Sequence, residues 1–274
     1  MATANTRVLP GFGLSLGGTL LYLSLIVLIP LAACFLKAAA LTWDQFWSTV
    51  WTERARSAYL LTFGASAAAA LANGLIGFII AWVLVRYHVP GKRFLDALVD
   101  LPFALPTAVA GLVYSSLYVR DGWLGRFLVP MGIEGAYSRL GIVLVLIFTG
   151  LPFVVRTLQP VLEDLDADME EAAASLGASR WQTFRHVIFP SLTPALLTGV
   201  ALALARALGE YGSVIFIAGN MPFRTEIAPV LIVARLEEFA YSEATALAAV
   251  LLVFSFLLLG VINLLQRWSK AYEG

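Results

Sequence analysis

The chain has 274 residues, of which 60% are hydrophobic and only 13% are charged. Soluble domains carry about 25% charged residues, and disordered chains combine low hydrophobicity with high charge. The composition therefore argues against both classes and indicates a membrane protein. The 18 basic and 18 acidic side chains cancel, so no basic surplus points to nucleic acid.

Long uncharged runs mark the segments that can cross a bilayer, whose apolar core is about 30 Å thick and needs roughly 20 apolar residues. They predict an all-α membrane protein with six transmembrane helices in a single domain over residues 1–274. The fourth span has a short uncharged run between two arginines. Arg139 and Arg156 would therefore have to extend their side chains to the membrane surface. The predicted spans are residues 12–36, 57–85, 97–119, 140–160, 190–214 and 243–266.

The first run must be distinguished from a signal peptide. Residues 31–34 resemble the site where bacterial lipoproteins are cut and lipidated. A signal peptide, however, has an apolar region of about 7–15 residues, and residues 8–33 exceed that length. We therefore interpret Cys34 as an ordinary membrane-helix residue. It is the only cysteine, and no His/Cys cluster is visible, so we expect no disulfide, metal site, cofactor or catalytic residue.

The loops between the spans are short. Residues 41–54 and 225–241 are candidate amphipathic surface segments, the first of them rich in tryptophan, which favours the headgroup level of a membrane. With both ends of the chain on one side, nine basic residues lie on that side and eight on the other. This balance gives no orientation under the positive-inside rule.

The longest polar stretch, residues 163–190, predicts a helix–turn–helix. Acidic residues at its start suit the positive end of a helix dipole, and an Ala-rich segment follows. Gly177 is placed to end the first helix in a left-handed conformation. Ser179 and Gln182 then have the spacing of a capping box for the second helix, and Pro190 marks the entry to the fifth span.

This stretch resembles the cytoplasmic loop of importer-type ABC permeases, which has the pattern E-A-A, three residues, G, nine residues, I-x-L-P. Here Glu171-Ala172-Ala173 precede Gly177, and residues 187–190 read Val-Ile-Phe-Pro, with two mild apolar departures. The resemblance implies a coupling loop that seats on an ATPase subunit, with both chain termini in the cytoplasm. The alternative is an Ala-rich hairpin on the membrane surface. The implied coupling residues are Glu171, Ala172, Ala173, Ser175, Leu176, Gly177 and Arg180.

Further stretches are similar to the T-type membrane subunit of bacterial sulfate/thiosulfate importers. They are residues 96–111, 151–157, 209–220 and 225–229. The resemblance covers most of the chain, and the stretches 101–111 and 209–220 are those that point to sulfate. Permeases for molybdate or tungstate share the architecture and remain the nearest alternative.

The resemblance implies a type I ABC importer with the MetI-like fold in a bacterial inner membrane. The expected partners are a homologous W-type permease subunit, a cytoplasmic ABC ATPase dimer and a periplasmic sulfate/thiosulfate-binding protein. The chain itself would hydrolyse nothing, and it contains no G-x-x-x-x-G-K-[ST] phosphate-binding loop.

A few charged and polar residues lie within or beside the spans. Arg206 and Glu210 are four residues apart on the predicted fifth helix, so they can pair. They form, with Tyr211 and Ser213, a candidate pathway or gate; the alternative is an internal salt bridge that locks helices together. Each charge would cost about 2.5–3.5 kcal/mol at the bilayer centre, so both should face the bundle or water.

The start of the third span combines prolines with charge. Pro102 and Pro106 lie in its first turns, where proline is tolerated at a helix start and kinks the helix further in. Asp96 and Asp100 precede it, and the neighbouring cations of residues 92–93 are close enough to balance them. We interpret these charges as interfacial.

Two other classes of membrane protein fit the sequence less well. A secondary transporter would show inverted repeats and intramembrane acids for ion coupling, and only Glu210 qualifies. A membrane enzyme would need clustered nucleophiles or metal ligands inside the spans, and the sequence has none. The sequence therefore favours an ABC importer subunit.

Overall fold

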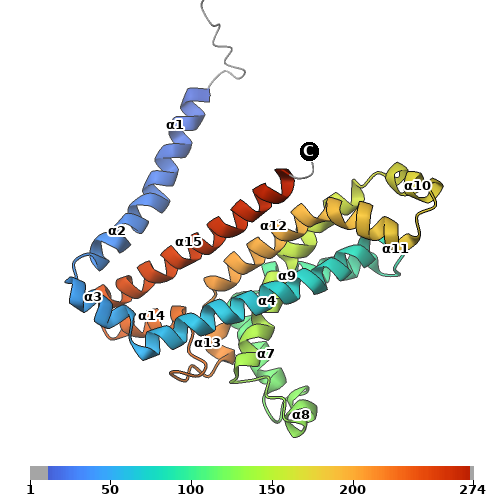
Figure 1. Ribbon diagram of the computed structural model, residues 1–274. Coiled ribbons are helices and arrows are strands. Elements are labelled where there is room, and N and C mark those ends of the chain that lie inside the picture. The colour runs from blue at the N-terminus through green and yellow to red at the C-terminus, as the bar shows by residue number, and fades with distance from the viewer. Residues whose placement is uncertain (1–11, 272–274) are drawn as a thin grey trace, which may run out of the picture.

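The computed structural model describes residues 12–271, with side chains through Leu264. All regular secondary structure in this part of the chain is helical (Figure 1). Five helical segments are long and apolar enough to cross a membrane. They are Phe12–Ala38, Glu53–Arg86, Arg139–Glu163, Arg180–Leu208 and Tyr241–Leu264.

The elements follow one another with short connections. The first half contains α1 (Phe12–Leu23), η1 (Ser24–Leu28), α2 (Ile29–Ala38), α3 (Trp43–Val50), α4 (Glu53–Arg86), α5 (Lys92–Val99), α6 (Leu101–Ala104), α7 (Thr107–Tyr118), α8 (Gly125–Leu128) and η2 (Val129–Met131). The second half contains α9 (Arg139–Glu163), α10 (Ala167–Ser175), α11 (Arg180–Thr183), η3 (Phe184–Ile188), α12 (Phe189–Leu208), α13 (Val214–Ile217), α14 (Ala228–Glu237) and α15 (Tyr241–Ala271).

Three long helices, α4, α9 and α12, form the centre of the bundle (Figure 1). Small side chains let them approach closely, as in other membrane helix pairs. A Cβ atom on Gly199 of α12 would lie 2.8 Å from the Val154 Cα atom of α9, and one on Gly77 of α4 would meet the Val154 side chain at the same distance. The three helices therefore approach one another closely around Val154, at the positions of two glycines.

Two turns of π-helix occur within residues 12–271, and each comes just before a proline. The turn η1 precedes Pro30 by two residues, and η3 precedes Pro190 by two residues. A proline has no backbone N–H, so the preceding turn lacks one helical hydrogen bond. The π-turns let both helices run on through the proline. Pro190 therefore lies inside one helical segment, Arg180–Leu208, rather than at its start.

The predicted third span is not one continuous helix. Residues 97–119 are divided among the end of α5, α6 and α7, and Leu105 has an extended backbone (φ −88°, ψ 131°). Pro106 explains the break, because a proline disfavours helical geometry in the residue before it. The sequence predicts a kink at these prolines, but the structure has a full interruption.

The fifth predicted span, residues 190–214, also needs a correction at its far end. The helix α12 stops at Leu208, and the chain then turns before α13. Glu210 consequently lies beyond the helix and not on it. The segment from 209 to 217 packs against α7, where a Cβ atom on Gly111 would lie 2.2 Å from the Ser213 carbonyl oxygen. Only glycine at position 111 permits this approach.

A cluster of ionic hydrogen bonds ties the broken span to α9. The Arg156 guanidinium donates two bonds to Asp100 (2.8 and 2.6 Å), two to Asp96 (2.8 Å to the carboxylate and 2.9 Å to the carbonyl) and one to Gln159 (2.6 Å). All five of its N–H donors are therefore used. The ion pairs of both carboxylates come from Arg156 on α9, and of the two predicted cations Lys92 adds a smaller favourable charge interaction with Asp96.

The same contacts act on Asp96. The Gln159 amide donates to its carboxylate (3.0 Å), partial burial opposes this effect, and Arg156 adds a charged bond, so the pKa of Asp96 lies below its usual range. A lowered pKa contributes stability above the pKa of the unfolded chain, about 3.9 for aspartate. That contribution is lost as the pH falls through the folded pKa. The cluster is therefore intact at neutral pH.

We predict that Arg156→Gln lowers the stability of the chain, because two carboxylates four residues apart lose their shared cation. Hydrogen bonds to charged groups are worth about 1.5–3 kcal/mol each when well formed, and partial exposure reduces this. Thermal unfolding of the purified chain should show a transition several degrees lower. Arg93→Gln, which removes an exposed cation with no ion pair among the described residues, is the control. Equal transitions for the two variants would contradict the assignment.

Candidate functional site

The loop of residues 163–190 forms the helix–turn–helix that its spacing predicts. Asp166 caps α10 by accepting a hydrogen bond from the Asp168 amide (3.0 Å). Gly177 has φ +82°, in the left-handed region, and ends the helix. Ser179 and Gln182 make both bonds of a capping box at the start of α11 (2.8 and 3.3 Å). The angle between α10 and α11 is thus fixed by one glycine and one capping box.

The loop packs on the bundle through an aromatic cluster between α4 and the α11–η3 segment. Phe184 stacks on Trp181 and meets Trp82 edge-on, with both pairs of ring centroids 5.5 Å apart. Phe78 contacts both Phe184 and Phe189 at about 6 Å. Aromatic pairs of this geometry add roughly 0.5–1.5 kcal/mol each beyond area burial. The α11–η3 segment is therefore anchored on α4.

The helix α10 is tied to the bundle by a salt bridge. Arg86, the last residue of α4, donates to the Glu170 carboxylate at 2.5 Å, and its guanidinium lies over the Trp82 ring. These partners are 84 residues apart in the sequence, so no local spacing predicts the contact. Arg86 and Glu170 are the residues of this site that sequence reasoning missed.

The candidate coupling residues gather on an exposed surface. No residue of α10 is buried, and the Leu176 side chain at its end is 89% exposed. The structure thus brings the predicted set together on one projecting element, at the end of α9 and the start of the α11–α12 segment (Figure 1). Ala173 is half-buried, whereas the others are exposed: Glu171, Ala172, Ser175, Leu176, Gly177 and Arg180.

The predicted pair at the far end of α12 is present. Arg206 donates to Glu210, whose side chain is only 2% exposed, while that of Arg206 is 34% exposed. Glu210 also accepts hydrogen bonds from the Ser213 amide (2.9 Å) and hydroxyl (2.8 Å). Tyr211 packs at the edge of the apolar cluster beside α13. The carboxylate therefore holds the turn that follows α12 as well as the arginine.

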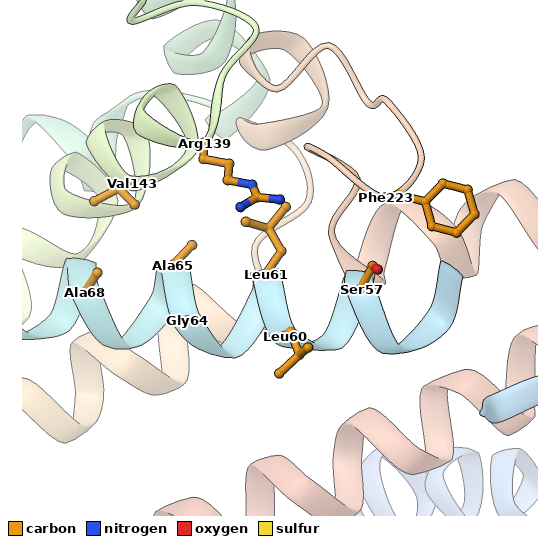
Figure 2. A pocket seen from close by; sticks show the side chains of 9 residues that line it. All are labelled: Ser57, Leu60, Leu61, Gly64, Ala65, Ala68, Arg139, Val143 and Phe223. Atoms are coloured by element: carbon orange, nitrogen blue, oxygen red, sulfur yellow. The ribbon is translucent and has the colours of Figure 1, made fainter. Parts of the chain in front are cut away.

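The end of the bundle opposite the loop has its own ion pair and cleft. Arg54, at the start of α4, donates two bonds of 2.7 Å to the buried Glu226 carboxylate. Figure 2 shows a nearby cleft of about 430 Å³, in which Arg139 reaches from α9 over Leu61 of α4. The Arg139 Nε donates to the Arg224 carbonyl at 2.8 Å. Within residues 12–271 we find no group of three side chains able to hold a metal ion.

Comparisons with known proteins agree with this architecture. The family model for binding-protein-dependent transport system inner membrane components matches residues 73–271. The sulfate transport system permease protein CysT of Synechocystis is 54% identical, over 93% of this chain and 89% of its own. The protein of the same name from Escherichia coli K12 is 50% identical, over 100% of this chain and 99% of its own.

Solved structures with a similar fold are ABC transporters. A bacterial ABC transporter for the acidic polysaccharide alginate has a chain that superposes with a TM-score of 0.75 at 18% identity, covering 92% of this chain and 93% of its own. At that identity the likeness concerns the fold alone. An amino acid ABC transporter gives a TM-score of 0.56, at 20% identity and over 81% of this chain and 97% of its own. The chain therefore belongs to the binding-protein-dependent transport system inner membrane components, the permease subunits of ABC importers, and among them to the CysT type.

Proposed function

We propose that this chain is the membrane-spanning subunit of an ATP-driven importer of sulfate and thiosulfate, and that it forms half of the translocation pathway. The observation that carries the proposal is the 50–54% identity to sulfate transport permeases over nearly the whole chain. The importer fold supports it independently of the sequence.

The coupling loop is the proposed seat of a cytoplasmic ATPase dimer. A helix without a single buried residue, held at a fixed angle by Gly177 and tied to α4 by Arg86, suits a role in transmitting movement to a partner. ATP hydrolysis takes place in that partner. The loop then faces the cytoplasm, so both chain termini lie there and the chain lies in a bacterial inner membrane, with the broken segment of residues 97–119 as the third of six crossings.

Two further partners complete the proposed importer. The most apolar window of the Phe12–Ala38 segment has no buried residue, and α1 points away from the rest of the bundle in Figure 1. This uncovered apolar helix supports a second, W-type permease subunit beside it. A periplasmic binding protein delivers sulfate or thiosulfate, as the alginate transporter solved with its ligand-bound periplasmic protein suggests by analogy of fold.

We assign the turn after α12 to the pathway or its gate. Arg206 is the partly exposed cation of the pair, while Glu210 and Ser213 are buried and hold the turn. Tyr211 lies between Glu210 and Ser213 in the sequence. In this arrangement Glu210 lowers the attraction of Arg206 for a dianion, which suits a site that sulfate passes without tight binding.

The central test is uptake of labelled sulfate in cells that lack the chain. Restoring the chain should restore uptake, and unlabelled thiosulfate should compete, whereas molybdate should not. Competition by molybdate, with no effect of thiosulfate, would replace the proposed substrate by another oxyanion. Copurification of an ATPase subunit from native membranes checks the class of transporter in the same strain.

Coupling should depend on the left-handed backbone at Gly177. We predict that Gly177→Val assembles but lowers sulfate uptake several-fold, because a β-branched residue disfavours positive φ by about 1–2 kcal/mol and changes the angle between α10 and α11. Gly177→Asn, which tolerates this conformation, should retain uptake. Gly91→Val is the matched control, since Gly91 has φ +74° in another exposed loop and a Cβ there meets nothing within 4 Å. An equal loss in the control would contradict a specific role in coupling.

The pathway and structural roles of Arg206 can be separated by a double variant. Arg206→Gln leaves the buried Glu210 carboxylate without a cation, so less folded chain should accumulate. Arg206→Gln combined with Glu210→Gln removes both charges and should restore folding. If the folded double variant still imports sulfate poorly, the Arg206–Glu210 pair acts in the pathway. Wild-type uptake by the double variant would leave Arg206 only its structural salt bridge.

A further inference from the structure

Two adjoining cavities lie where the coupling loop meets the end of α4. We name them the cationic cavity and the apolar groove, with volumes of about 460 and 410 Å³. They share Trp82, Arg180 and Phe184, so together they form one continuous surface. The cationic cavity is further lined by Arg86 and Glu170, and the apolar groove by Phe78 and Trp181.

The charges of the cationic cavity are only partly compensated. Arg86 bonds to Glu170 through one nitrogen, but its Nε–H is buried and has no acceptor. Arg180 makes no ion pair with any described residue, and no hydrogen bond from its side chain is found. Two guanidinium groups against one carboxylate give the cavity a formal charge of +1. An anion is therefore the ligand that it would favour.

The two cavities lie at different depths along α4. Arg86 is the last residue of that helix, whereas Phe78 comes eight residues earlier, about 12 Å deeper at 1.5 Å per residue. The Trp181 side chain is 65% exposed beside the groove, and tryptophan favours the boundary between headgroups and acyl chains. A charged recess at a helix end, continuous with an apolar groove toward the membrane interior, has the polarity profile of a phospholipid.

We propose that this composite site binds one anionic phospholipid, with its phosphate beside Arg86 and Arg180 and an acyl chain along Phe78 and Trp181. Basic pockets between membrane helices are known to hold anionic headgroups. The lipid would bridge α4 and α11, the two elements that seat the coupling loop. The site requires only that the loop lie at a membrane surface, so it stands or falls independently of sulfate transport.

The test uses the full-length chain in vesicles of equal parts phosphatidylglycerol and phosphatidylcholine. After mild detergent extraction, native mass spectrometry counts the lipids retained on each chain. We expect one retained phosphatidylglycerol, preferred over phosphatidylcholine. Arg180→Gln should lower this preference roughly fivefold, the equivalent of about 1 kcal/mol for one arginine near anionic lipid. Arg185→Gln, an exposed arginine that lines neither cavity, should leave it unchanged.

Other outcomes would overturn the proposal. Equal retention of phosphatidylcholine would mean that the groove binds acyl chains without regard to charge. Equal losses in Arg180→Gln and Arg185→Gln would mean diffuse attraction to basic loops. Displacement of the lipid by excess inorganic phosphate would identify the site as one for a free anion. Release of the lipid on adding the ATPase subunits would assign the cavity to that partner.

Discussion

In a bilayer, a backbone N–H or C=O group without a partner costs several kcal/mol, so non-helical backbone survives only where protein covers it. This chain leaves helical geometry at Leu105–Pro106 and again after Leu208. The two breaks lie close together. Thr107, just after the first break, would have its hydroxyl 2.3 Å from a Cβ atom on Gly212, which lies in the second. The two breaks therefore pack against each other, with Glu210 and Ser213 buried and with Pro106 and Gly209 left exposed.

The few charged side chains also lie mainly near helix breaks and helix ends. Within residues 12–271, the longer-range or buried ion pairs come from four arginines: Arg54, Arg86, Arg156 and Arg206. Arg156 holds the broken span on α9, and Arg206 holds the turn after α12. Placing the charges at breaks and helix ends, where water or a partner is near, reduces the desolvation penalty that a fully buried pair would carry.

Local features of the fold could be predicted from the sequence. The loop of residues 163–190 carries its own signals, since Asp166, Gly177 and the Ser179–Gln182 capping box all act within a few residues. Long apolar runs likewise predict the long helices. The helix ends were less predictable: hydropathy continues past Leu208, and Pro106 indicates a kink, while the complete break depends on packing against another segment.

Contacts between distant residues could not be predicted. Arg54 and Glu226 are 172 residues apart, and Arg156 and Asp100 are 56 apart. Each carboxylate also has nearer basic residues in sequence, Arg224 for Glu226 and Arg93 for Asp100, but its ion pair comes from the distant arginine. For the same reason the cationic cavity has no sequence signature, since its two arginines, Arg86 of α4 and Arg180 of the coupling loop, are 94 residues apart.

The helix α4 has a mechanical consequence. It runs unbroken for 34 residues, about 51 Å, with no proline inside it, so it bends little. Arg54 in its first turn forms an ion pair with Glu226, which precedes α14. Arg86 in its last turn forms an ion pair with Glu170 in the coupling loop. The helix α4 is thus a stiff element with an ion pair near each end. A tilt of this helix would therefore move its contacts with Glu226 and with Glu170 together.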